Sequence, residues 1–290
     1  MNRSFLALLT AAMFLLISTT GCITNTRPLS TANEFKAPGL SGLWRGVGED
    51  KKSNLFYIDD CGDHFKLYCM SNYSPSRFTI AKITSPDRKQ NMDTISWAMP
   101  LPAETLQQLK IKTVYLIFGY DLSKDHIALL SIDPENAKLK AAINALPHTK
   151  ESKLLDAKPE QLREVLAKNM NAFKRLPLNF YRTGFKNQRS KEVFMACANF
   201  LPDYEMKLQS LFQFKNPQAE LKKLHDSLLR WRQENTKLLP ESFKEIIDAH
   251  LRLVATAIAD KSKISLLRRG EVRNFISKIE AAGVKELTRQ

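Results

Sequence analysis

The sequence is poor in the residue types and patterns that identify catalytic chemistry. Its 290 residues include only five histidines and four cysteines, and the histidines are scattered along the chain. It has no Gly-x-Ser-x-Gly turn, no His-Glu-x-x-His helix, no phosphate-binding glycine loop and no Cys-x-x-Cys pair. We therefore expect a non-enzymatic protein with no cofactor and no metal ion.

Long apolar runs are also scarce, and the single one lies at the amino terminus. It extends from Phe5 to Ile17 after the positively charged Arg3 and is followed by small residues. A membrane-spanning helix needs about 20 apolar residues, and no later run reaches that length. A charged start, a short apolar run and small residues are typical of a secretory signal peptide.

The residues at the end of this segment resemble a known processing motif. Thr19-Thr20-Gly21-Cys22 resembles the lipobox of bacterial lipoprotein precursors, with Thr19 where that motif usually has Leu. The resemblance implies that residues 1–21 are removed and that Cys22 carries the lipid. In such lipoproteins an Asp after the cysteine favours the inner membrane, and Ile23 stands there instead. We therefore expect a lipid-anchored protein of the cell envelope, at the outer membrane.

The segment 22–40 is polar, contains two prolines and shows little periodicity. Such a composition is typical of a flexible linker. We expect it to be the lipidated cysteine followed by a flexible tether.

The net charge of +14 is concentrated in the second half of the chain. Up to Asp133 there are 14 basic and 12 acidic side chains, and from Pro134 onward there are 30 and 18. Export excludes nucleic acid as the partner. The charge instead favours anionic lipid, lipopolysaccharide or a cell-wall polymer.

Two kinds of periodicity predict an α+β fold. From residue 41 to 133, short runs alternate between apolar and polar residues, as around Ile80 and Ile95, which predicts a small antiparallel β barrel or sandwich of about seven strands. From 134 to 290 the apolar residues recur at helical spacing, which predicts a basic α-helical domain. Its helices open near Pro159, Pro217 and Pro240.

Gly42-Leu43-Trp44, at the start of the first predicted strand, is similar to the Gly-x-Trp opening of lipocalin-type barrels. In that family the Trp closes one end of an apolar ligand cavity.

The segment from Asp59 to His64 combines carboxylates, a thiol and an imidazole, which together could bind a metal ion. The flanking strands favour a tight hairpin turn instead.

Lipidation leaves Cys61, Cys69 and Cys197, an odd number, so at most one disulfide forms. In a hairpin, Cys61 at the turn and Cys69 on the returning strand are about 26 Å apart, too far for a bond. We expect three free, buried thiols, with a bridge from Cys197 to one of the others as the alternative.

The stretch from Val165 to Lys191 combines basic and aromatic residues and contains no acidic residue. Such a stretch suits a membrane surface or a polyanion. The candidate binding residues are Lys174, Arg175, Arg182, Lys186 and Arg189. The leading hypothesis is a protein that acts by contact with another envelope component or an anionic surface, and the alternative is a lipocalin-like carrier of an apolar ligand.

The anchor is tested by Cys22→Ala. Because the sequence offers no other insertion device, this variant is expected to lose acylation and to move from the membrane to the soluble periplasmic fraction. Mass spectrometry and fractionation measure both effects. An Ala variant that still sediments with membranes after a high-salt wash shows that the lipid is not the anchor.

Overall fold

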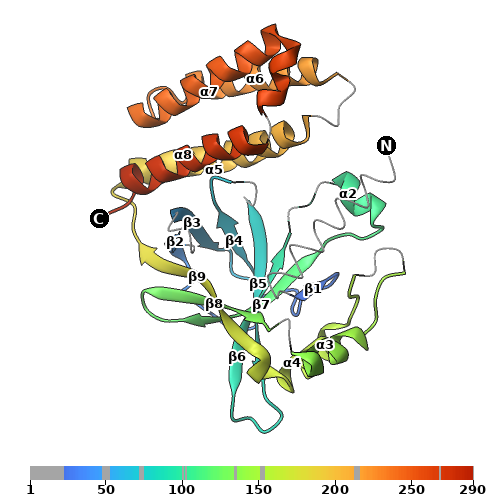
Figure 1. Cartoon of the computed structure of the whole chain (residues 1–290). Helices are drawn as coiled ribbons and strands as arrows, with labels where there is room; N and C mark the ends of the chain where they lie inside the picture. The colour runs from blue at the N-terminus through green and yellow to red at the C-terminus, as the bar shows by residue number, and fades with distance from the viewer. Residues whose placement is uncertain are drawn as a thin grey trace. The chain divides into compact units, whose positions relative to one another are not determined.

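The protein is described by a computed structural model (Figure 1). The residues that it describes are 23–47, 53–71, 75–99, 101, 103–133, 136–150, 154–211, 216–267 and 269–289. The expected signal peptide and Cys22 lie outside these residues.

The elements combine strands and helices, so the predicted mixed α+β class is confirmed. Nine strands are described: β1 (Ile23–Asn25), β2 (Gly42–Val47), β3 (Ser53–Asp60), β4 (Phe65–Tyr68), β5 (Ser76–Thr84), β6 (Asn91–Ala98), β7 (Tyr115–Leu122), β8 (His126–Ile132) and β9 (Phe173–Thr183). The α-helices are α2 (Ala103–Gln108), α3 (Ala137–Asn144), α4 (Pro159–Ala167), α5 (Gln188–Gln209), α6 (Pro217–Glu234), α7 (Glu241–Ala259) and α8 (Arg269–Leu287). Two 3-10 helices lie at Met170–Ala172 and Lys261–Leu267.

The strands form one sheet with the order β1-β7-β6-β5-β4-β3-β2-β9-β8, and β8 also pairs with β7. Strands β2 to β9 therefore form a closed antiparallel barrel in which each strand lies beside the next along the chain. This up-and-down arrangement of eight strands is the one that lipocalins use. The additional strand, β1, pairs with β7.

Two strands, β1 and β9, were not predicted from the sequence, and β1 lies in the segment expected to be a tether. The helix predicted to open near Pro159 ends at Ala167, and β9 occupies residues 173–183 within the stretch where only helices were predicted. Within β9, the apolar residues Leu176, Leu178 and Phe180 alternate with other residues, which is the period of a strand.

The chain groups into two compact units. Unit 1 comprises residues 1–41, 59–66 and 76–180, and unit 2 comprises 42–58, 67–75 and 181–290. This grouping differs from the expected boundary between 133 and 134, because α3, α4 and most of β9 belong with the strands of unit 1.

In unit 1, α3 and α4 cover one face of strands β5 to β7. Ala81, Ile83, Met92 and Ile117 of the strands form an apolar cluster with helix residues such as Leu139, Leu162 and Leu166. Gly119 of β7 leaves room on this face, since a Cβ there would come within 2.8 Å of the sulfur of Met92 on the neighbouring β6.

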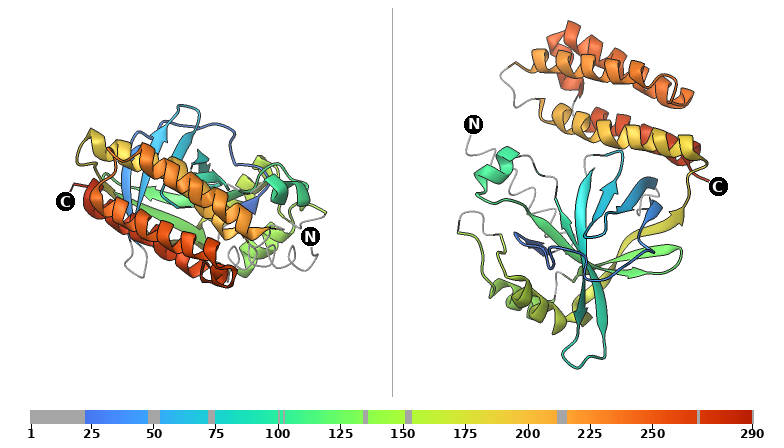
Figure 2. Two further views of the ribbon diagram at one scale, coloured as in Figure 1. Left: turned by 90° about the horizontal axis from the view of Figure 1, so that it is seen from above. Right: turned by 180° about the vertical axis from the view of Figure 1, so that it is seen from behind.

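In unit 2, the predicted helical stripes are buried. Helix α6 buries Leu221, Leu224, Leu228 and Trp231, and α7 buries Phe243, Ile247, Leu251 and Val254. Helix α5 packs beside α8, and α6 packs beside α7 (Figures 1 and 2). Gly283 lies inside α8, where a Cβ would be 3.2 Å from Met70. It therefore serves close packing.

The hairpin predicted at residues 60–63 is confirmed. The amide of Cys61 donates to the carbonyl of His64 over 2.9 Å, and Gly62 has a φ of +87° that suits glycine. The three described cysteines are free thiols. Cys69 and Cys197 are buried as predicted, whereas Cys61, at the tip of the turn, is exposed.

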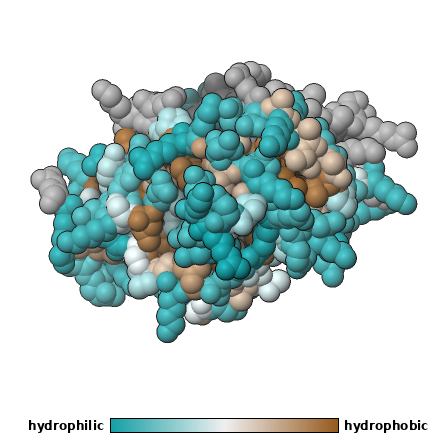
Figure 3. All heavy atoms as spheres, turned by 90° about the horizontal axis from the view of Figure 1, so that it is seen from below, coloured by the Kyte–Doolittle hydropathy of each residue, from teal (hydrophilic) through white to brown (hydrophobic). Residues whose placement is uncertain are grey.

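Among the described residues, no group of three or more His, Cys, Asp or Glu side chains is placed to hold a metal ion. The helices within the described ranges are all too short or too polar to span a bilayer. The face shown in Figure 3 is mostly hydrophilic, with small apolar areas between charged and polar side chains.

Two titratable groups on the helices of unit 2 are shielded from water: His250 is buried and Glu280 is half-buried. His250 contacts the hydroxyl of Tyr204 through Nε2 at 3.0 Å, and burial lowers the pKa of His250 to about 4, so its ring is neutral. Burial, together with the charge of Glu205, raises the pKa of Glu280 to about 7.

Glu280 makes stability depend on pH. The folded chain binds its proton more tightly than the unfolded chain, so the contribution is greatest below the ordinary pKa of 4.5, falls as pH rises to about 7 and is constant above that. We expect Glu280→Gln to increase the free energy of unfolding at pH 8 by up to about 3 kcal/mol and to change it little at pH 4. Urea unfolding measures this, and Glu271→Gln, an exposed change on the same helix, is the control. Equal effects of Glu280→Gln at both pH values contradict the assignment.

Candidate functional site

The described part of the amino-terminal segment packs against the strands and helices of unit 1, to which it belongs. Leu29 is only 1% exposed and its amide donates to the hydroxyl of Ser96 over 2.9 Å. The side chain of Asn25 exchanges two hydrogen bonds with the backbone of Ala157. Ala37 and Leu40 are also buried. Residues 23–40 therefore form part of the folded unit and not a free tether.

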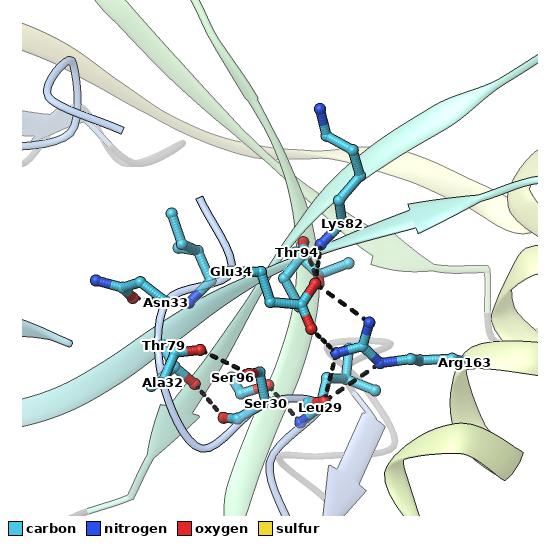
Figure 4. A network of polar contacts seen from close by, with 12 residues as sticks. Leu29, Ser30, Ala32, Asn33, Glu34, Thr79, Lys82, Thr94, Ser96 and Arg163 are labelled. Atoms are coloured by element: carbon cyan, nitrogen blue, oxygen red, sulfur yellow. Dashed lines mark hydrogen bonds and ion pairs between the residues drawn. The ribbon is translucent and has the colours of Figure 1, made fainter. Parts of the chain in front are cut away.

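Figure 4 shows the polar contacts that hold this segment. The guanidinium of Arg163, on α4, donates to both carboxylate oxygens of Glu34 and to the carbonyl of Leu29. One oxygen of Glu34 also accepts from the amide of Lys82 over 3.0 Å. The hydroxyl of Thr79 donates to the carbonyl of Ser30 over 2.7 Å. Charged and backbone groups thus fix the segment to both β5 and α4.

The opposite face of strands β5 to β7 carries a different set of side chains. Because successive residues of a strand point to opposite faces, the residues between those that contact α3 and α4 share this face. Their cross-strand register gives three rows: Phe78–Trp97–Leu116, Ile80–Ile95–Phe118 and Lys82–Asp93–Tyr120. We call these nine residues the wall.

The wall changes in polarity from one end to the other. The first row is apolar, with Phe78 buried and Trp97 and Leu116 half-buried, and Phe65 of β4 stacks on Phe78 with the ring centres 5.1 Å apart. The second row is entirely apolar and buried. The third row is polar, so the wall offers an apolar surface that ends in charged and hydroxyl groups.

Tyr120 is the most informative residue of the third row. It is 2% exposed, and its hydroxyl has no hydrogen-bond partner within the described residues. Burial raises its pKa, and the nearby carboxylate of Asp93 raises it further, so the hydroxyl keeps its proton. Burial also raises the pKa of Asp93, whose closest cation is Lys82 at 4.0 Å. The wall therefore contains a buried donor that has no partner among the described residues.

Trp44, singled out from the sequence, lies in unit 2 on β2 and is completely buried. The guanidinium of Arg182, on β9, lies 4.4 Å from the centre of its ring, a cation–π contact. Gly42 has a φ of +125°, and a Cβ at this position would be 3.1 Å from a nitrogen of Arg182. The Gly-x-Trp spacing thus has a local physical reason: the glycine leaves room for the arginine that covers the tryptophan.

The five predicted basic residues belong to different units. Lys174 and Arg175 are in unit 1, where they pair with Asp133 at 2.6 Å and with Asp121 at 3.2 Å. Both basic side chains are about two-thirds exposed. Their charges are therefore partly offset by neighbouring carboxylates.

The other three basic residues are in unit 2 and support its backbone. Besides Arg182, the ammonium of Lys186 donates to the carbonyl of Lys285 over 2.9 Å, near the end of α8. Arg189 donates to the carbonyl of Lys237 over 2.6 Å, in the connection between α6 and α7. Each of the five residues thus has a structural contact, and binding to an anionic surface stays a prediction for them.

Unit 2 also contains a pocket of about 300 Å³ between α5 and α6. Phe200, Tyr204 and Leu224 form its apolar part. Its rim carries two ion pairs, Lys207–Asp203 at 2.6 Å and Lys223–Glu220 at 2.8 Å, each within a single helix. The charges on its rim therefore already neutralise one another.

Comparisons of the chain with models of known protein families, with curated proteins and with solved structures find no match. The candidate site therefore has to be argued from its own residues.

Two buried tyrosines make a matched test of the unsatisfied hydroxyl. A buried hydroxyl without a partner costs about 1–3 kcal/mol, so Tyr120→Phe is expected to leave stability unchanged or to raise it by about 1 kcal/mol. Tyr204→Phe removes a hydrogen bond to His250 and is expected to lower stability by about 1 kcal/mol. Chemical denaturation measures both. A loss of stability in Tyr120→Phe as large as that in Tyr204→Phe shows that Tyr120 has a partner in the folded protein.

Proposed function

We propose that this chain is a lipid-anchored binding protein of the cell envelope, attached through Cys22, whose barrel carries an apolar ligand in the manner of lipocalin-type barrels. The observation that carries the proposal is the wall, an apolar and aromatic surface on three adjacent strands of an eight-stranded up-and-down barrel. Barrels of this size are just wide enough to hold side chains or one small ligand.

The polarity of the wall supports one kind of ligand. Its first two rows suit an acyl chain or another elongated hydrocarbon, because apolar contact with Trp97, Phe118 and their neighbours removes that surface from water. The third row suits a polar group at one end. The hydroxyl of Tyr120 would donate to an oxygen of the ligand and so gain a hydrogen bond that the described residues do not supply.

Leu116 offers a place to block the site. It is half-buried in the first row, so a larger side chain there has room to reorient without unfolding the strand. Tyr115, the preceding residue, points to the opposite face and pairs with Asn25 of β1. Leu116→Trp and Tyr115→Trp therefore add an indole at adjacent positions on opposite faces.

The experiment uses the soluble Cys22→Ala form and a fluorescent polyene fatty acid. We expect saturable binding of one probe per chain, strong weakening by Leu116→Trp and little change by Tyr115→Trp, with circular dichroism as the check on folding. Tyr120→Phe is expected to weaken binding about 3- to 10-fold, the loss of one hydrogen bond. Equal binding by the two Trp variants, or no saturable binding at all, excludes the wall as the site.

A further inference from the structure

The residue that follows the expected lipid attachment site belongs to the folded part of unit 1. Ile23 is the first residue of β1, pairs with Ile117 of β7 and is only 4% exposed. Consecutive Cα atoms are about 3.8 Å apart, so a lipid on Cys22 would be attached one residue from the first residue of β1. A lipid on Cys22 would hold this part of unit 1 against the bilayer with no spacer between them.

The strand registers show where on unit 1 this point lies. β8 pairs with β7 up to Leu130, which lies opposite Gly119, and β1 takes over along the same edge with Ile23 opposite Ile117. β1 and the end of β8 therefore lie along the same edge of β7. From the last residue of β8, Ile132, the chain reaches α3 within five residues.

Helix α3 is fixed beside this point. Leu139 of α3 is fully buried in the apolar cluster that also contains Ile23. The amide of Asp133, at the entrance to α3, donates to the carbonyl of Ala172 over 2.8 Å, next to the start of β9. The exposed side of α3 and the start of β9 are thus near the expected lipid.

The chemistry of this surface is basic. Lys138 and Lys140 are exposed on α3, and residues 136–150 contain no Asp or Glu. Lys174, at the start of β9, is 67% exposed and pairs with Asp133. The small residues Ala137 and Ala141 lie between the lysines on the exposed side of α3, so this side of the helix can come close to a flat surface.

We infer that Lys138, Lys140 and Lys174 form a surface that contacts the anionic headgroups of the bilayer in which the lipid on Cys22 is embedded. This inference rests on the proposed anchoring. The lipid brings the surface to the membrane, and the lysines orient unit 1 on it, because basic residues near an anionic membrane are attracted over a distance set by screening, roughly 8 Å at physiological salt.

The test uses the full lipidated chain, with Cys61→Ser so that the exposed thiol does not react. A fluorophore is attached to Ala141→Cys on α3 or, as the control, to Lys66→Cys on β4, three strands along the sheet from β7. The protein is reconstituted in vesicles of phosphatidylethanolamine and phosphatidylglycerol that contain a lipid with a quencher on its headgroup. Mass spectrometry of the same sample establishes whether Cys22 carries lipid.

We expect strong quenching at position 141 and little at position 66. Lys138→Gln with Lys140→Gln should lower the quenching at 141 to the level found in phosphatidylcholine vesicles or in molar salt, while Lys66→Gln with Lys89→Gln should not. The inference is overturned, and the anchor left intact, if a lipidated chain shows equal quenching at both positions. The same holds if the quenching does not depend on the charge of the lipids or on salt. A chain without lipid overturns the anchoring itself, and the inference with it, whereas ligand binding by the wall is unaffected.

Discussion

The antiparallel register of β5, β6 and β7 is the constraint on which the rest of unit 1 depends. These strands bury both of their faces: one packs under α3, α4 and the amino-terminal segment, and the other carries the wall. A slip of one residue would exchange the two faces and place Phe118 under the helices and Gly119 on the wall. Gly119 resists such a slip, because the close approach of Met92 leaves no room for a side chain there.

The excess of positive charge does not by itself create a binding site. Arg182 covers an indole ring, Lys186 and Arg189 hold carbonyl groups, and Arg163 fixes the amino-terminal segment through Glu34. An arginine suits such positions because its planar group makes several hydrogen bonds at fixed angles. Many basic residues in this chain therefore act within the fold, and a membrane contact has to be sought where lysines are exposed beside the expected lipid.

The sequence predicts those parts of the fold that follow from short-range periodicity. Alternation around Ile80 and Ile95 predicts strands, and the stripe from Leu221 to Trp231 predicts α6, because each pattern reflects one buried face. The closed barrel could be expected only as one of two arrangements, since closure depends on which strands pair. β9 was missed because basic residues and Pro177 obscure its alternation.

The packed state of residues 23–40 could not be predicted, because it depends on partners distant in sequence. Asn25 is satisfied by Ala157 and Glu34 by Arg163, more than 125 residues away in each case. In the same way, the wall exists only once β5, β6 and β7 are aligned. The sequence singled out Trp44 by its motif, but Tyr120 has no local signal, because the lack of a partner for its hydroxyl is a property of the folded chain.

A lipid attached directly before β1 would suit a barrel that binds an apolar ligand, because it would keep the barrel at the membrane surface. Exposing hydrocarbon to water costs about 0.8 kcal/mol for each methylene group, so a ligand with an acyl chain moves between protein and bilayer most easily when the two are in contact. If Cys22 carries a lipid, the pairing of Ile23 with β7 would supply that contact, because β1 belongs to the same sheet as the wall. A long flexible tether would instead let the barrel drift away from the membrane and make each transfer pass through water.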